Sequence, residues 1–281
     1  MASPDTVGSG RTGAATGVYE LFALKYAMNS KRTRHENFLP PHDPHDSPMP
    51  IDLFVWVAVS KERIVLIDSG ADEKTVRARG YEFIRCPTTA LAALGIAADA
   101  VTDLVVTHLH WDHAGNFDKF PRARLWAHGK ETAYATGPCM AQPFLRRPFD
   151  VDHVCSLVRA LYAGRVEFND GDRTIAPGIS VHHVGGHTPG LQVVRVSTAR
   201  GAVVVASDAL HYYENWTRRV PFPVVVHADE YLAAFGTIER LADSPDHVVA
   251  GHDPAVLELY PRVPGPAEAF AVRLDVPPRR R

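Results

Sequence analysis

The sequence predicts a single domain of the α+β class, built from short apolar strands and a smaller number of helices. Its 281 residues, of which 46% are hydrophobic and 22% charged, can bury one large core. Short β-branched runs that end in a polar side chain, such as Val203–Val205, recur along the chain and predict buried strands. A few longer segments have helical composition, the last of them at residues 229–242. We find no internal repeat, so these elements are expected to form one mixed domain.

The first half of the chain begins with a low-complexity segment. Residues 1–16 are rich in Gly, Ser, Thr and Ala, which predicts a disordered segment ahead of the domain. Residues 19–26 predict the first strand, and residues 28–50, punctuated by prolines, predict a long loop. The other elements predicted here are strands at 54–59, 63–67 and 103–107, and helices at 88–94 and 114–120.

In the second half, the predicted secondary structure changes from strands to helices at about residues 130–163. Two helical segments there, 130–135 and 152–162, are joined by a proline-containing link, and we expect a helical insert. The remaining predicted elements are strands at 179–184, 193–196, 202–206 and 248–250 and a helix at 229–242. The domain is expected to span residues 17–265, followed by a C-terminal tail at 266–281.

Metal-capable side chains stand directly after several predicted strands. Residues 107–113 contain the pattern H-x-H-x-D-H, immediately after the apolar run Leu104–Val106. His187 lies in a glycine-rich turn after a strand, and Asp208 and His252 each follow a short apolar strand. Imidazole nitrogens and carboxylate oxygens are ligands that Zn²⁺ accepts, and Fe or Mn can use the same set. The pattern therefore predicts a metal site where the strands end.

This order of residues resembles the signature of the metallo-β-lactamase superfamily, in which H-x-H-x-D-H precedes a lone His, an Asp and a final His. The resemblance covers roughly residues 50–260 and implies an αβ/βα four-layer sandwich in a single domain. Asp68 matches the superfamily's early aspartate after a strand. The implied ligands are His108, His110 and His187 for one metal, Asp112, His113 and His252 for the second, and Asp208 as the bridge between them.

The resemblance also implies a reaction. Two divalent ions, zinc first and Fe, Mn or Co as alternatives, would share a hydroxide that attacks an ester carbonyl, with Asp112 as a candidate proton shuttle. The spacing from His113 to His187 and the Gly-Gly-His-Thr-Pro-Gly turn resemble the lactonase branch, which includes the N-acyl homoserine lactonases. That branch carries a substrate-binding tyrosine three residues after the bridging aspartate. His211 stands there, followed by Tyr212, and either is a candidate to contact the substrate.

Other functions stay open at this point. A thioester hydrolase of the glyoxalase II kind uses the same seven ligands, although the usual basic groups for glutathione are not evident after the final metal-binding strand. A non-catalytic metal-binding sensor could retain the fold, but the complete ligand set argues against it. The net charge of −2 and the lack of a basic stripe argue against a nucleic-acid partner. A small-molecule lactone or ester is the expected partner.

Three features of the sequence bear on the cellular location of the protein. The chain has no run of 18 apolar residues, which argues against a membrane span, and its first residues lack an apolar signal region. Three scattered cysteines, Cys86, Cys139 and Cys155, suggest reduced thiols. We therefore expect a cytoplasmic protein, with a homodimer as a candidate assembly.

Further side chains are candidates for the surroundings of the metals. His182 and His183 alternate along a strand, so only one can face inward, and we expect support rather than ligation. The candidates for an apolar pocket are Phe38, Trp56, Phe144, Phe149, Trp216 and Phe222. Trp216 and Phe222 are favoured because they follow Asp208 in a loop that is expected on the same side of the domain as the metals.

Overall fold

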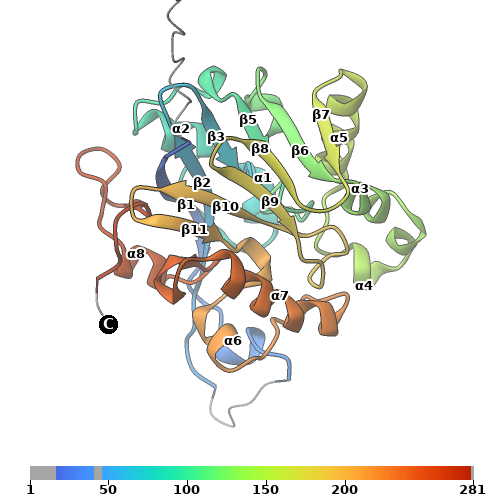
Figure 1. Cartoon of the computed structure of the whole chain (residues 1–281). Helices are drawn as coiled ribbons and strands as arrows, with labels where there is room; N and C mark the ends of the chain where they lie inside the picture. The colour runs from blue at the N-terminus through green and yellow to red at the C-terminus, as the bar shows by residue number, and fades with distance from the viewer. Residues whose placement is uncertain (1–16, 41–45, 280–281) are drawn as a thin grey trace, which may run out of the picture.

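Two β-sheets packed face to face form the centre of the molecule (Figure 1). The computed structural model describes residues 17–40 and 46–279, so the disorder expected for residues 1–16 lies outside the described residues. Helices cover the outer face of each sheet, as the contacts of α2 with β1 and of α7 with β11 illustrate. This four-layer arrangement confirms the predicted αβ/βα sandwich.

The first sheet has eight strands. They are β1 (Glu20–Asn29), β2 (Ile51–Val59), β3 (Ile64–Ile67), β4 (Glu82–Phe83), β5 (Asp103–Val105), β6 (Arg124–His128), β7 (Val166–Asn169) and β13 (Ala271–Arg273). Their order is β13-β1-β2-β3-β5-β6-β7, with β4 paired to β1. From β3 to β7 the strands are parallel, so their carboxyl ends lie along the same edge.

The second sheet has five strands in the order β12-β11-β10-β9-β8. Its members are β8 (Arg173–Ala176), β9 (Ile179–His183), β10 (Gln192–Thr198), β11 (Gly201–Val205) and β12 (Val248–Val249). β11 and β12 are parallel, so Asp208 and His252 follow strands that end on the same side. Buried Val, Ile and aromatic side chains of both sheets, Trp56 and Val194 among them, form the core between them.

Eight α-helices complete the described part of the chain. They are α1 (Glu73–Ala78), α2 (Pro87–Ala92), α3 (Gly129–Ala135), α4 (Pro143–Arg146), α5 (Val151–Tyr162), α6 (Tyr213–Thr217), α7 (Ala228–Leu241) and α8 (Ala255–Leu259). α7 is amphipathic: Tyr231, Ala234, Phe235 and Ile238 are spaced by three and four residues and are buried against the second sheet. None of the described helices is long and apolar enough to cross a bilayer.

Two sequence expectations are wrong. Residues 114–120 form a turn and a single 3₁₀ helix (Phe117–Lys119) rather than an α-helix. The amide of Gly115 donates to the Gly70 carbonyl at 2.6 Å, so the chain is tied to the loop after β3 instead of to its own preceding turn. Residues 271–273, assigned to a tail, form β13 in the first sheet, and Phe270 and Leu274 beside it are buried. The sequence also failed to predict α1.

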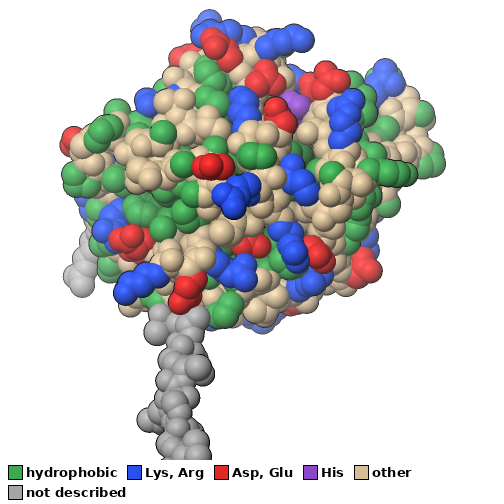
Figure 2. Space-filling model, turned by 90° about the horizontal axis from the view of Figure 1, so that it is seen from above, with side chains coloured by type: hydrophobic (Ala, Val, Ile, Leu, Met, Phe, Trp, Pro, Cys, Tyr) green, Lys and Arg blue, Asp and Glu red, His purple; other side chains and the backbone are tan. Residues whose placement is uncertain are grey.

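The surface charges of one face are mixed. Figure 2 shows basic and acidic side chains interspersed on it, without a stripe of a single sign. This distribution agrees with the near-neutral net charge of −2.

The packing of α7 gives a stability prediction. Phe235→Ala removes a fully buried ring from the core and should lower the free energy of unfolding by about 3–5 kcal/mol. Leu232→Ala on the same helix is the matched control: Leu232 is 40% exposed, and a change within about 0.5 kcal/mol is expected. Chemical denaturation of both variants measures this, and equal losses would contradict the assigned face of α7.

Candidate metal centre

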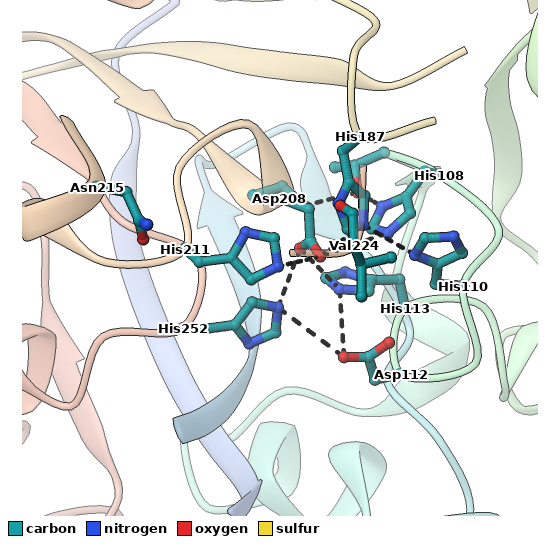
Figure 3. A network of polar contacts seen from close by, with 12 residues as sticks. His108, His110, Asp112, His113, His187, Asp208, His211, Asn215, Val224 and His252 are labelled. Atoms are coloured by element: carbon teal, nitrogen blue, oxygen red, sulfur yellow. Dashed lines mark hydrogen bonds and ion pairs between the residues drawn. The ribbon is translucent and has the colours of Figure 1, made fainter. Parts of the chain in front are cut away.

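The predicted ligands come together where the strands end (Figure 3). The H-x-H-x-D-H residues follow β5, and His187 lies in the loop between β9 and β10. Asp208 follows β11, and His252 follows β12. Gly251 allows this approach, because a Cβ there would stand 2.3 Å from the Ser207 carbonyl oxygen.

Asp208 lies at the centre of the group. Its Oδ2 atom is 3.0 Å from Nε2 of His187 and 3.7 Å from Nε2 of His108. Its Oδ1 atom is 2.9 Å from Nε2 of His252 and 3.0 Å from Nε2 of His113. The two carboxylate oxygens therefore face two different sets of imidazoles, as a bridging ligand requires.

The last two predicted ligands complete these sets. His110 places its Nδ1 atom 2.8 Å from Nε2 of His187, on the Oδ2 side of Asp208. Asp112 places its Oδ2 atom 3.6 Å from Nε2 of His113 and 3.9 Å from Nε2 of His252, on the Oδ1 side. All seven predicted ligands thus meet in one place.

Three of the histidines are held by hydrogen bonds from the ring nitrogen that points away from Asp208. His113 Nδ1 donates to Asp68 at 2.7 Å, His187 Nδ1 to the Val224 carbonyl at 2.6 Å, and His252 Nδ1 to the Asp52 carbonyl at 2.8 Å. Such bonds fix the orientation and the tautomer of each ring, which leaves the other nitrogen available as a ligand.

Asp68 connects three of the strand ends. Its fully buried carboxylate accepts hydrogen bonds from the Thr107 amide at 2.8 Å, from the Thr107 hydroxyl at 2.7 Å and from His113. The Thr107 hydroxyl is in turn 2.9 Å from the Ser207 hydroxyl, next to Asp208. Asp68 and Ser207 have positive φ values of 59° and 44°, a backbone strain that is characteristic of functional sites.

The donor set fits divalent metal ions. Nε2 of His108 and Nε2 of His113 are buried and make no hydrogen bond with the described residues. Buried polar atoms of this kind are rare unless a further partner binds. Within each group, His108, His110, His187 and Asp208 on one side and Asp112, His113 and His252 on the other, the candidate ligand atoms lie within 4.8 Å of one another. Nitrogen and oxygen donors suit Zn, Fe, Mn and Co.

The electrostatics favour a cation at this point. Burial raises the pKa of Asp208, but the surrounding imidazoles, His113 first, outweigh it and hold that pKa well below its usual range. Burial lowers the pKa of His113, yet the carboxylates of Asp208, Asp112 and Asp68 raise it well above its ordinary value. Positive charge is therefore stabilised between these groups.

Comparisons with known proteins agree with this geometry. The family model described as the metallo-beta-lactamase superfamily matches residues 52–252. The chain belongs to this superfamily. The expected resemblance to the lactonase branch is also confirmed, because an N-acyl homoserine lactonase from Bacillus sp. is 26% identical over 189 residues, covering 61% of this chain and 70% of the relative.

Solved structures share the metallo-β-lactamase fold. A quorum-quenching N-acyl homoserine lactone lactonase has a TM-score of 0.70 at 20% identity, covering 84% of this chain and 93% of that one. AidC, described as a dizinc quorum-quenching lactonase, has a TM-score of 0.62 at 18% identity, covering 86% of this chain and 90% of that one.

A pocket of about 640 Å³ opens over the ligands of this metallo-β-lactamase centre. His110, Asp112, His187, Asp208 and His252 form its floor, and Phe222 is part of its wall. The volume is within the range of sites for small organic molecules. Phe149 packs its ring against His110 with 4.7 Å between ring centroids.

The other aromatic candidates lie elsewhere. The prediction that Trp216 lines the pocket over the ligands is wrong. Its Nε1 atom donates to Glu239 at 2.8 Å, and its side chain lines a separate cavity with Tyr213 and Tyr260. Phe38 and Trp56 are buried, and neither lines the pocket over the ligands. Phe144 is 70% exposed and lines a smaller adjacent cavity.

The structure separates His211 from Tyr212. His211 Nε2 is 3.0 Å from Asp208 Oδ2, and its ring stacks on Phe222 at 3.6 Å in the pocket. Tyr212 points away from the ligands, and its hydroxyl donates to the Pro50 carbonyl at 3.2 Å. The backbone is extended at Leu210 and Tyr212, so neighbouring side chains alternate in direction and only His211 reaches the site. Of the two candidates, only His211 lines the pocket over the ligands.

Some supporting residues escaped the sequence analysis. The buried carboxylate of Glu131 accepts the Leu109 amide at 2.9 Å and the Gly190 amide at 3.1 Å, and so ties two ligand loops together. In the sequence Glu131 resembles an ordinary charge in the first turn of a helix, and nothing there signals its burial. Nor does the sequence indicate that the Tyr231 hydroxyl hydrogen-bonds Nδ1 of His211 at 3.2 Å.

The expected support by one of the paired histidines agrees with the geometry. His183 Nε2 donates to the Pro189 carbonyl at 2.8 Å and so fixes the turn that carries His187. His182 faces Asp172 at 2.8 Å instead. Neither belongs to the metal-ligand groups.

The role of Asp68 can be tested by Asp68→Asn. The variant keeps the shape but loses the charge that orients His113, so metal affinity should fall about 10- to 100-fold. Competition with a chromogenic chelator measures this fall. Asp72→Asn, a change at an aspartate away from the ligands, is the matched control and should bind metal normally. Unchanged affinity in Asp68→Asn would show that the hydrogen bond to His113 is dispensable.

Proposed function

We propose that this protein is a metal-dependent hydrolase that opens a lactone ring. The observation that carries the proposal is the placement of Asp208, whose two oxygens face two separate ligand sets at the floor of a pocket of about 640 Å³. The names of a curated relative and of similar solved structures, all N-acyl homoserine lactonases or quorum-quenching lactonases, support the lactone as substrate class.

Two divalent metal ions would be held by the seven residues. His108, His110 and His187 would bind one ion, Asp112, His113 and His252 the other, and Asp208 both. When bound, such ions polarise an ester carbonyl and lower the pKa of water to about 7. Zinc is the first candidate, and Fe, Mn and Co fit the same donors.

Asp112 is the residue proposed to move a proton. Its side chain is 13% exposed, in contrast to the nearly fully buried Asp208, and it lines the pocket. Its Oδ2 atom faces the ligand set, so the other carboxylate oxygen is the one that can accept a proton during attack on the carbonyl and return it to the leaving alkoxide oxygen. The Tyr26 hydroxyl donates to the Asp112 carbonyl at 2.7 Å and holds the backbone there.

His211 is proposed to orient the reacting groups. Burial lowers the pKa of His211 to about 3, so the ring is neutral and has one N–H to donate. Tyr231 on one side and the stacked Phe222 ring on the other fix its plane. The single N–H of His211 therefore holds Asp208, and the ring stands in the pocket at the position of the tyrosine of the lactonase branch, where it can contact a substrate through its face and carbon atoms.

Location and assembly stay predictions. We propose a cytoplasmic protein, supported by three free cysteines, Cys86, Cys139 and Cys155. We also keep the small-molecule ester as the expected partner, without nucleic acid or membrane, and the homodimer as a candidate assembly.

Turnover by the zinc-reconstituted full chain tests the proposal. Acyl-homoserine lactones, simple γ- and δ-lactones, an aromatic lactone and S-lactoylglutathione would be assayed by proton release. We expect lactone hydrolysis that is lost on chelation and restored by metal. Hydrolysis of the thioester alone would replace the lactonase by a thioester hydrolase, and metal binding without turnover would favour a sensor.

A matched pair of variants tests the assignment of Asp112. Asp112→Asn removes both a metal ligand and the proton acceptor, and we expect kcat to fall by about 10² or more. Asp118→Asn changes a nearby aspartate outside the ligand set and should leave kcat within twofold of the unmodified protein, an order-of-magnitude bound for changes at uninvolved surface residues. Near-normal turnover of Asp112→Asn would refute the role.

A further inference from the structure

Three arginines from separate parts of the chain lie around the pocket over the ligands. Arg32 follows β1, Arg79 follows α1, and Arg147 follows α4. We propose that this arginine rim, defined as Arg32, Arg79 and Arg147, binds an anionic group on the substrate, so that the protein prefers lactones that carry a carboxylate. This inference rests on the proposed function and narrows its substrate class.

The rim has no negative partner in the described structure. Between residues 17–40 and 46–279, no carboxylate lies within ion-pairing distance of the three guanidinium groups. Other arginines of the protein do have such partners, among them Arg34 with Glu214 and Arg63 with Asp103. Some arginines elsewhere on the described surface also lack such a partner, and the rim differs from them because its three arginines line one pocket, over the candidate metal ligands.

Two of the rim arginines are held in place by neutral groups. Arg79 donates to the carbonyls of Arg147 and Phe149, the latter at 2.9 Å, and lies over the Trp111 ring at 5.6 Å. Arg32 donates to the Asn37 side chain and, at 2.6 Å, to the Glu36 carbonyl. A guanidinium has five N–H donors, and these bonds leave some of them for a ligand.

Arg32 is also connected to the reaction centre. Its guanidinium carbon lies 5.0 Å from the centroid of the Phe222 ring, and the same ring stacks on His211. His211 in turn contacts Asp208. A substrate whose ester lies at Asp208 and His211 would therefore extend past Phe222 toward Arg32.

The other charges of the pocket do not cancel the rim. Glu36 is exposed and its carboxylate accepts the Thr33 amide at 2.8 Å, while His35 faces Asp46. Asp112 and Asp208 are predicted metal ligands, so their negative charge would be neutralised by the bound ions. A half-buried guanidinium over an aromatic ring attracts an anion strongly because little water screens it.

A carboxylate suits this arrangement better than a neutral acyl chain. Planar guanidinium groups bind carboxylates through paired hydrogen bonds, which neutral chains cannot provide. Phe222 stands between His211 and Arg32, and Pro223 and Val224 line the same pocket, so this apolar wall would contact the linking carbons. The substrate class is therefore a lactone with an apolar side chain that ends in an anionic group.

A pair of matched lactones tests the inference. Both carry the same alkyl side chain on a γ-lactone ring, which ends in a carboxylate in one and in a carboxamide in the other. With zinc-reconstituted full chain, we expect kcat/KM to be at least about tenfold higher for the carboxylate, the lower end of the effect of a focused field. Raising the salt concentration should reduce this preference.

Variants of the three rim arginines test whether these residues cause the preference for the carboxylate. Arg32→Gln, Arg79→Gln and Arg147→Gln should each reduce the carboxylate-to-carboxamide ratio of kcat/KM. Arg32→Lys should keep part of it because the charge remains. Arg124→Gln is the matched control: Arg124 pairs with Glu167 at 3.2 Å outside the pocket, so the ratio should not change. Circular dichroism confirms that each variant is folded.

The outcomes separate the two proposals. Hydrolysis of neither lactone of the pair nor of any lactone in the panel would refute the proposed function, whereas hydrolysis of panel lactones but of neither member of the pair would refute the arginine rim. Hydrolysis of both with equal kcat/KM, or a preference that persists in all three glutamine variants, would refute the arginine rim and leave the lactonase standing. A preference that falls in these variants and not in Arg124→Gln would establish the rim.

Discussion

Asp208 is a carboxylate that is only 3% exposed, and five imidazole rings face its two oxygens. A buried charge is tolerated only when it is well paired, so the rings must be brought to it from four places in the chain. The same requirement explains why the strand ends meet here: β5 of the first sheet and β11 and β12 of the second are each followed by candidate ligands. The architecture of the sandwich can thus be understood as a support for this one side chain.

The layer of residues behind the ligands fixes them at a cost in backbone strain. Asp68 and Ser207 adopt positive φ values so that their side chains reach Thr107 from two strands. Glu131 performs a similar task from α3, by accepting amide protons of the two loops that carry His110 and His187. Because these groups are buried and satisfied, the candidate ligands are preorganised, and metal binding would require little motion.

Much of this arrangement could be predicted from the sequence. Ligand spacing is a local property, since H-x-H-x-D-H after an apolar strand places four donors at one strand end. The fold followed from it through the family resemblance, and the seven side chains that the resemblance implies as ligands do come together in the structure. Residues 114–120 were predicted wrongly because hydrogen bonds to the loop after β3 override local helical preference. Tyr212 and Trp216 show the same limit, since the direction of a side chain depends on backbone angles that the sequence does not reveal.

The rim arginines illustrate a second limit of sequence analysis. Arg32 and Arg79 are distant in the chain and lie in a loop and at a helix end, where arginines are common. Only the three-dimensional structure brings them to one pocket and shows which arginines have carboxylate partners. Pairing of this kind is a tertiary property, and no local pattern encodes it.

Asp208 is proposed to bridge two metal ions. A crystal structure of the zinc-reconstituted protein, with anomalous diffraction recorded on both sides of the zinc absorption edge, would locate these ions. We expect two anomalous peaks, one next to each oxygen of Asp208. A single peak, or two peaks that both lie away from Asp208, would contradict this proposal.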